Sequence, residues 1–370
     1  RYRCWSCGKY GDVISFIQDH EHVGFREALE LLAHRAGISL QSSDNPEEQS
    51  AYEARTRLLE VMNWAWGLYH CCYLDDAEAE AARIYLGQRR LLGPTVRRFG
   101  VGYAPPSGDW LVRHAQSEKI SLEDLEVVGV IAKRSQGNVY YDRFRERMLC
   151  PIRDPVGQPI GFGGRILPSS PLAQRAPKYY NSPDTPLFNK SEVLYGLDLA
   201  RADAVKAGYL AVVEGYTDVL MCHQHGIGNV VATMGTALTA RHVSQLRRFV
   251  PKVVLVFDAD AGGSTGVDRA LEIFASQEVD LSIATLPEGM DPCELLSQSE
   301  GAERFRTCLE QARDALTFKL EEILQRESMD SIEGQRRAVD AVLGVLALAP
   351  ELPGQAGAVR RELMISRVAR

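Results

Sequence analysis

Residues 209–260 read YLAVVEGYTDVLMCHQHGIGNVVATMGTALTARHVSQLRRFVPKVVLVFDAD, and this stretch determines the class of fold. It contains three short apolar runs of strand length, at 209–213, 229–232 and 253–257, separated by segments of helix length. A strand–helix–strand–helix–strand alternation implies parallel strands that are covered by the intervening helices. The sequence therefore predicts an α/β domain built on a parallel sheet.

Acidic residues follow two of the predicted strands. Glu214 comes directly after the first run, with Asp218 four residues further on, and the third run ends in Asp258 and Asp260. Because the carboxyl ends of parallel strands share the edge of the sheet where ligands bind, we expect these side chains to converge. Converging carboxylates repel one another unless a cation lies between them, and hard oxygen ligands favour Mg²⁺ or Mn²⁺. The sequence thus predicts a divalent metal site.

A fourth apolar run, residues 281–286, extends the predicted sheet. Its carboxyl end leads to Asp291, which we expect at the same edge as a further metal ligand. Cys293 follows two positions later and is interpreted as a small apolar packing residue rather than a ligand. The glycine-rich turn at 261–266 can hold a phosphate at a helix N-terminus, but it lacks the Gly-Lys-Ser/Thr ending of a P-loop.

The composition of the 370-residue chain is that of a globular protein with two or three domains, with 45% hydrophobic and 25% charged residues. A formal net charge of −7 argues against a uniformly basic nucleic-acid binder but allows a local basic groove. No apolar run reaches membrane-spanning length, and no signal peptide is visible. The eight scattered cysteines favour a metal site over a disulfide framework.

Cys4 and Cys7, followed by a glycine, form a turn that is typical of a zinc site. His20 and His22 are separated by one residue, too few for a zinc finger, and are interpreted as solvated residues at a helix end. The missing ligands are expected upstream of Arg1. A redox pair, or two ordinary cysteines, is the alternative that stays open.

Residues 41–50 are polar and predict a linker, whereas 51–100 show apolar residues at helical spacing. Within this helical segment, His70 and the adjacent pair Cys71 and Cys72 are expected to be buried packing residues rather than metal ligands. The linker predicts a domain boundary between the cysteine-containing start of the chain and the rest.

Arginines crowd a glycine-rich segment at 100–170, in which 148–152 and 159–164 predict two strands around a turn. Such a segment is typical of a surface that phosphates approach closely, and equally of an exposed hairpin crosslinked by salt bridges; the pattern leaves both open. The arginines are Arg143, Arg145, Arg147, Arg153 and Arg165.

The proline-rich loop that follows carries two cations, Lys178 and Lys190. The pair Tyr179 and Tyr180 either stacks on nucleic-acid bases or anchors the loop. A long irregular loop inside a compact domain is often functional.

Several motifs resemble a known family. The acids at 214–218, the Met-Gly-Thr turn and the Asp258-x-Asp260 pair resemble the TOPRIM domain of type IA and II topoisomerases, bacterial primases, some nucleases and recombination-mediator proteins. Flanking segments separate these classes, and they resemble bacterial replicative primases of the DnaG type over essentially the whole chain. These segments are RRFGVGYAPP (97–106), YDRFRERMLCPIRDPVGQPIGFGGRIL (141–167), KYYNSPDTPLFNKSEVLYGL (178–197) and LPEGMDPCELL (286–296).

The resemblance implies a DNA primase, a nucleotidyltransferase that makes short RNA primers on single-stranded DNA from ribonucleoside triphosphates. It implies Glu214, Asp258 and Asp260 as catalytic residues, with Glu214 either a metal ligand or a general base. The further implied ligands of Mg²⁺ or Mn²⁺ are Asp218 and Asp291. The implied nucleotide- or template-binding residues are Arg165, Lys178, Lys190 and Arg98.

The resemblance also implies a structural zinc ion on Cys4 and Cys7, completed by a cysteine and a histidine upstream of Arg1. The family often has an acidic residue where Cys293 stands, which leaves Asp291 or Glu294 to bind metal in this chain. The implied partners are the replicative helicase, through a C-terminal domain that we expect to be absent here, and single-stranded DNA-binding protein. A monomeric bacterial cytoplasmic protein is expected.

The expected fold is multidomain, α/β and α+β, with a TOPRIM-type parallel sheet flanked by helices. Around it we expect a partial zinc ribbon, a mixed N-terminal subdomain and a helical C-terminal subdomain. The predicted boundaries are 1–40 for the zinc-binding part, 41–50 for the linker, 51–206 for the mixed subdomain, 207–297 for TOPRIM and 298–370 for the helical subdomain.

Two other functions remain as alternatives. A TOPRIM nuclease or topoisomerase would break phosphodiester bonds, and a topoisomerase would need a nucleophilic tyrosine other than Tyr216, which lies within the acidic motif. A DNA-binding module without catalytic activity is the second alternative.

Overall fold

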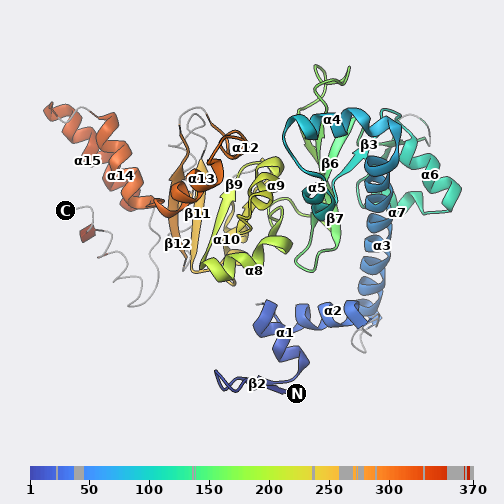
Figure 1. Cartoon of the computed structure of the whole chain (residues 1–370), viewed down its shortest axis with the longest axis horizontal. Helices are drawn as coiled ribbons and strands as arrows, with labels where there is room; N and C mark the ends of the chain where they lie inside the picture. Colours follow the sequence, from blue (N-terminus) through green and yellow to red (C-terminus); the bar gives the residue numbers. More distant parts are fainter. Residues whose placement is uncertain are drawn as a thin grey trace. The chain divides into compact units, whose positions relative to one another are not determined.

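The computed structural model divides the chain into two compact units, residues 1–202 and 203–370 (Figure 1). The division falls inside helix α8 (Leu197–Ala207), within a few residues of the predicted boundary between 206 and 207. None of the described helices is both long and apolar enough to cross a membrane. The structure describes residues 1–21, 24–36, 46–135, 137, 139–235, 238–257, 270–271, 273, 279–287, 290–327, 330–347, 362 and 365–366.

The first unit starts with a small module in which two antiparallel strands precede two helices. Asp12 caps the first helix by accepting a hydrogen bond from the backbone N–H of Ser15 at 2.8 Å. The two helices pack through the buried side chains of Ile17 and Ala28. The elements are β1 (Tyr2–Arg3), β2 (Tyr10–Gly11), α1 (Val13–Glu21) and α2 (Phe25–Ala36).

A long helix, α3 (Pro46–Asp75), corrects the predicted linker, because residues 46–50 are already helical. Pro46 has a φ angle that fits the first helical turn, and the acidic side chains of Glu47 and Glu48 interact favourably with the positive end of the helix dipole. A polar composition at 46–50 therefore marks a solvated helix start rather than a linker. Residues 41–45 lie outside the described part of the chain.

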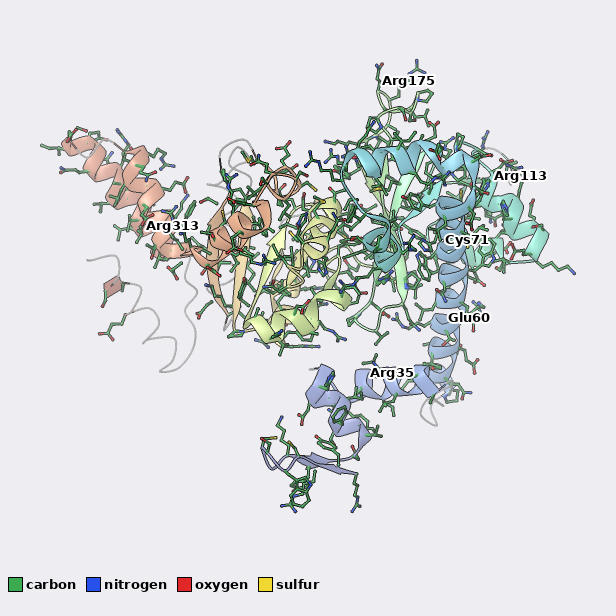
Figure 2. All side chains as sticks on the ribbon, in the orientation of Figure 1. Arg35, Glu60, Cys71, Arg113, Arg175 and Arg313 are labelled. Carbon is green, nitrogen blue, oxygen red and sulfur yellow. The ribbon has the colours of Figure 1, made fainter. Side chains whose placement is uncertain are left out.

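The prediction that Cys71 is a buried packing residue is wrong. Cys71 is exposed on α3, whereas Cys72 is buried and His70 is half-buried (Figure 2). Consecutive helical residues point about 100° apart, so Cys71 and Cys72 point in different directions, and only Cys72 of the two lies on the buried side of α3.

The rest of the first unit is mixed α and β. Its main sheet has the order β3-β6-β7-β8, all antiparallel, and α3 packs against β3 and β7. The predicted pair of strands around a turn is confirmed as β6 and β7. The elements are η1 (Ala77–Ala79), α4 (Glu80–Gln88), α5 (Gly93–Phe99), β3 (Gly102–Ala104), α6 (Trp110–Glu118), α7 (Leu122–Val127), β4 (Ile131–Lys133), β5 (Tyr140–Asp142), β6 (Arg147–Arg153), β7 (Pro159–Ile166) and β8 (Tyr179–Asn181).

A buried carboxyl group joins β5 to α6. Asp142 is 2% exposed and accepts hydrogen bonds from the backbone N–H groups of Leu111 at 2.8 Å and Val112 at 3.2 Å. Burial raises the pKa of Asp142 to about 6, although these hydrogen bonds act in the opposite direction.

This raised pKa predicts a pH-dependent stability. The folded state holds the Asp142 proton more tightly than the unfolded chain, whose aspartate pKa is about 4, so this contribution to stability falls as pH rises from about 4 to about 6. We expect the first unit to lose up to about 3 kcal/mol relative to an Asp142→Asn variant between pH 4 and pH 7.

The measurement is urea unfolding followed by tryptophan fluorescence at each pH. All four tryptophans lie in the first unit, so the signal reports that unit alone. An unchanged difference in unfolding free energy between the two proteins across this pH range would contradict the prediction.

The second unit contains the predicted parallel sheet, in the order β10-β9-β11-β12-β13. The first four strands are parallel, as expected, and Figure 1 shows β9, β11 and β12 side by side. Its sheet strands are β9 (Tyr209–Val213), β10 (Val230–Ala232), β11 (Lys252–Phe257), β12 (Asp280–Thr285) and β13 (Arg313–Asp314). Its helices, after the end of α8, are α9 (Tyr216–Gln224), α10 (Ala240–Leu246), α12 (Pro292–Leu296), α13 (Gly301–Glu310), α14 (Ala315–Arg326) and α15 (Ile332–Ala347).

The segment from 298 onward, which was predicted to be helical, also contains the short strand β13. Strand β13 pairs antiparallel with β12, and α13 packs against β12 and α12. Helices α14 and α15 pack on each other through the buried side chains of Leu316, Ile323 and Ala338, and α14 also packs against β12 and β13. A two-residue strand carries almost no periodic signal, so sequence patterns do not detect it.

Candidate metal and phosphate sites

Two predicted acids lie where strand β9 gives way to helix α9. Glu214 is exposed and directly follows the strand, whereas Asp218 is 8% exposed and lies in the first turn of the helix. Asp218 Oδ2 accepts a hydrogen bond from the backbone N–H of Gly215 at 3.2 Å. The N-terminus of α9 thereby holds the carboxylate, and its dipole stabilises the negative charge.

This arrangement requires glycine at position 215 because a side chain there would collide with Asp218, not because the backbone adopts an unusual conformation. Its φ of −117° is open to any residue, but a Cβ atom there would lie 2.7 Å from Asp218 Oδ2. Any other residue at 215 must therefore displace the Asp218 carboxylate.

We expect Gly215→Ala to reduce metal-dependent activity about tenfold or more, since small displacements of a reacting group have large effects on rate. The measurement is nucleotide incorporation over a Mn²⁺ titration. Gly344→Ala on α15 is the control, because a Cβ atom there would meet nothing within 4 Å. Equal activity of the two variants would show that Asp218 is not displaced or not needed.

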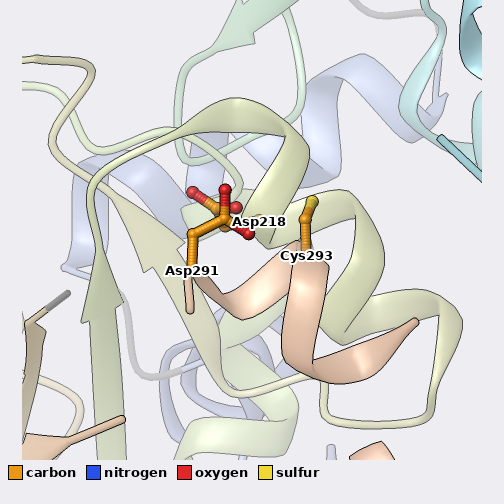
Figure 3. Close-up of side chains that lie close together, drawn as sticks. All are labelled: Asp218, Asp291 and Cys293. Atoms are coloured by element: carbon orange, nitrogen blue, oxygen red, sulfur yellow. The ribbon is translucent and has the colours of Figure 1, made fainter. Parts of the chain in front are cut away.

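Asp291 and Cys293 complete a three-residue cluster with Asp218 (Figure 3). One ligand atom from each of the three residues lies within 4.8 Å of the other two. Asp291 is the N-cap of α12 and accepts a hydrogen bond from the backbone N–H of Glu294 at 2.7 Å. The two carboxylates therefore lie at two helix N-termini, which lowers the electrostatic cost of bringing them together. Paired carboxylate oxygens are ligands that fit a hard divalent cation.

Cys293 is 4% exposed, and burial, reinforced by the nearby negative charges of Asp218 and Asp291, raises the pKa of its thiol far above the usual range. A neutral thiol is a poor ligand for Mg²⁺. The interpretation of Cys293 as a small packing residue agrees with this burial, and the structure places its thiol beside Asp218 and Asp291.

Asp258 and Asp260 lie outside the described residues. Strand β11, which they follow, ends at Phe257 and pairs in parallel with β9, so its carboxyl end lies at the same edge as Glu214. Their convergence with Asp218 and Asp291 stays a prediction.

The four predicted phosphate-binding cations occupy different surroundings. Arg98 and Lys178 are exposed, Lys190 is half-buried, and Arg165 is 5% exposed. Arg165 in β7 lies opposite Tyr179 in β8 and donates a hydrogen bond from Nη1 to its hydroxyl at 2.6 Å. Lys178 Nζ lies 5.7 Å from the centre of the same ring. The structure therefore brings Arg165 and Lys178 together around Tyr179.

Arg147 and Arg153 have structural roles. Arg147 donates to the carbonyl oxygens of Gly164 at 3.2 Å and Pro177 at 2.9 Å, which holds the loop that precedes β8. Arg153 pairs with Asp198 at 3.3 Å. Since nearly all residues of β6 and β7 are buried, the alternative of an exposed, salt-bridged hairpin is wrong.

Three family models match successive parts of the chain. They describe a CHC2 zinc finger at residues 1–48, the N-terminal domain of the DNA primase catalytic core at 69–201, and a Toprim-like domain at 211–296. The chain is 35% identical over 386 residues to a DNA primase of Streptomyces coelicolor, an alignment that covers 100% of this chain and 59% of that protein. A DNA primase domain of Pseudomonas aeruginosa has a similar structure, with a TM-score of 0.75 and 34% identity over 84% of this chain and 95% of that one.

The chain belongs to the DNA primase family.

A DnaG primase catalytic domain bound to single-stranded DNA is also similar, with a TM-score of 0.73 and 32% identity over 86% of this chain and 96% of that one. The primase-family chain spans a little over half the length of the curated relatives that it matches, 59% for Streptomyces coelicolor and 55% for Mycolicibacterium smegmatis. The zinc-finger and Toprim matches imply that it binds zinc and a divalent metal ion.

The zinc-finger match includes the turn that carries Cys4 and Cys7. The turn is closed by a hydrogen bond from the backbone N–H of Gly8 to the carbonyl oxygen of Cys4 at 3.0 Å. Backbone N–H groups of Cys7 and Ser6 lower the pKa of the Cys4 thiol, which favours the thiolate form that binds zinc. His20 is exposed in the last turn of α1, as expected of a solvated residue at a helix end, and stacks on Phe16; His22 lies outside the described residues.

Proposed function

We propose that this chain contains the polymerase core of a DNA primase, a DNA-directed RNA polymerase that joins ribonucleoside triphosphates into short primers on single-stranded DNA. The observation that carries the proposal is the pair of carboxylates from Asp218 and Asp291 at the sheet edge of a Toprim-like domain in a primase-family chain. Primer synthesis is nucleotidyl transfer, which requires mainly positioning and charge neutralisation.

In this reaction a nucleotide 3′-hydroxyl attacks an α-phosphate, and pyrophosphate leaves. We assign Asp218, Asp291, Asp258 and Asp260 as the residues that hold Mg²⁺ or Mn²⁺, since carboxylates fit hard cations. When bound, the ions neutralise the triphosphate and lower the pKa of the attacking hydroxyl. Glu214, exposed directly after the carboxyl end of β9, is assigned as a further ligand or as the general base.

Arg165, Lys178, Lys190 and Arg98 are assigned to the phosphates of the template or the incoming nucleotide. Buried or half-buried cations hold a fixed geometry, while exposed ones supply charge without fixing orientation. The similar catalytic domain bound to single-stranded DNA supports a template of that kind. As part of the same proposal, the protein works with a replicative helicase in the bacterial cytoplasm, and a zinc ion on Cys4 and Cys7 has a structural role.

The test of the function is de novo synthesis on single-stranded DNA with ribonucleotides and Mn²⁺ or Mg²⁺. We expect short RNA products that require the metal, and no relaxation or nicking of supercoiled DNA by the same preparation. Metal-dependent nicking or relaxation without RNA synthesis would replace the proposal with a nuclease or topoisomerase. DNA binding with neither reaction would favour a non-catalytic module.

A further inference from the structure

A line of alternating cations and tyrosine rings crosses the first unit. The Arg165 guanidinium carbon lies 5.2 Å from the ring centre of Tyr85 and 5.1 Å from that of Tyr179. The line continues on both sides, with Arg89 at 5.7 Å from the Tyr85 ring and Lys178 at 5.7 Å from the Tyr179 ring. Tyr85 belongs to α4, so a helix remote in the sequence supplies one wall around the central arginine.

Within the described part of the chain, the central guanidinium is buried without a carboxylate partner. Among the described residues no carboxylate forms an ion pair with Arg165, and its Nε is buried without a hydrogen-bond partner. Leaving a buried donor unsatisfied is unfavourable, and more so when the group is charged. A buried cation in this state is explained by a ligand that brings a negative oxygen, and a phosphate does so.

The two rings that enclose Arg165 differ in how firmly they are held. Tyr179 is 42% exposed, whereas Tyr85 is 8% exposed within the packed face of α4. Burial raises the pKa of Tyr85 against the opposing effect of Arg165 and Arg89, so the hydroxyl stays neutral. Tyr85 therefore offers the Arg165 guanidinium a fixed ring, and a cation–π contact with a fixed ring limits how the guanidinium can turn.

We propose that Tyr85 is a positioning residue, which holds the Arg165 guanidinium in the orientation that receives a phosphate of a single-stranded DNA template. This inference rests on the proposed function, because the phosphate is taken to be that of the template. Tyr85 acts through Arg165: without the ring the guanidinium keeps its charge but loses its fixed plane.

The test is the affinity of the full chain for a fluorescently labelled single-stranded oligothymidylate over a salt series. We expect Tyr85→Leu to weaken binding about tenfold, the size of a desolvated cation–π contact, and Tyr85→Phe to bind as the unaltered chain does. Tyr73→Leu is the matched control, because Tyr73 is also buried, at 7% exposure, on α3 and outside the line of stacked residues. If both leucine variants weakened oligothymidylate binding equally, Tyr85 would be a packing residue and not a positioning residue.

A double-mutant comparison tests whether Tyr85 affects DNA binding through Arg165. In an Arg165→Ala background, Tyr85→Leu is expected to weaken binding no further, since its partner is already missing. Independent, additive losses would overturn the proposal. If Arg165→Ala alone left oligothymidylate binding unchanged, the phosphate assignment of Arg165 would fail and the inference with it. If the binding pattern held but no primer were made, only the proposed catalytic function would fail.

Discussion

Replacing Asp218 by asparagine is expected to lower metal-dependent nucleotide incorporation by about a hundredfold or more, while the second unit stays folded. The carboxylate lies within 4.8 Å of the ligand atom of Asp291, so the change removes one of two negative charges that would face a divalent cation. Losing several kcal/mol of transition-state stabilisation corresponds to a rate loss of this size. Asparagine keeps an oxygen that can accept the hydrogen bond from the Gly215 N–H.

The control for this experiment is Asp280→Asn. Asp280 is exposed at the start of β12, so it lies at the amino end of a parallel strand, opposite the edge that carries the acids. Incorporation would be measured as a function of Mn²⁺ concentration, with far-ultraviolet circular dichroism as the check on folding. Comparable activity of Asp218→Asn and Asp280→Asn in folded proteins would exclude Asp218 from the metal site.

Replacing Asp198 by asparagine is expected to destabilise the first unit by about 3 kcal/mol, or about 10 °C in melting temperature. The carboxylate pairs with Arg153 at 3.3 Å, and both side chains are nearly buried, at 9% and 12% exposure. Arg153 also donates to the carbonyl oxygen of Phe99 at 2.8 Å and lies 5.7 Å from the Trp66 ring centre, so it cannot move to solvent without breaking these contacts. The variant would leave a buried positive charge without its partner.

The matched variant is Arg113→Gln, which breaks an ion pair of the same length in the same unit. Arg113 and Asp109 are also 3.3 Å apart but 60% and 57% exposed, so its loss is expected to change stability by less than about 1 kcal/mol. Tryptophan fluorescence during thermal unfolding measures both. Similar melting temperatures for the two variants would show that the Arg153–Asp198 pair contributes no more than a surface pair.

The local pattern of apolar residues was sufficient to predict much of the fold. The alternation of β-branched runs and helix-length segments at 209–257 predicted the parallel strands β9, β10 and β11, because strand and helix periods depend on neighbouring residues. The strands β6 and β7 around a turn were likewise predicted. The helical start at residues 46–50 and the strand β13 were not, since a polar helix N-terminus resembles a linker and two residues carry no period.

The candidate metal site was predictable in part for the same reason. Three of the predicted acids follow the ends of strands: Glu214, Asp218 and Asp291. Parallel pairing brings the carboxyl ends of the strands to one edge of the sheet, and this does not depend on how the side chains pack. The proximity of Cys293 to Asp218 depends on the packing of α12 against α9, which the local sequence of neither helix determines.

The roles of the arginines depended on tertiary structure alone. Three arginines of the same chemistry lie in the adjacent strands β6 and β7. Arg147 and Arg153 bond carbonyl oxygens or a buried carboxylate, whereas Arg165 lies between two rings and has no carboxylate partner among the described residues. Residues from distant elements of the fold surround each guanidinium differently, and these surrounding groups determine what the guanidinium binds. The strand ends of residues 209–257 and the acids that follow them were thus set by local sequence, whereas packing across the fold decided which of these arginines pairs with a carboxylate and which lies between two tyrosine rings.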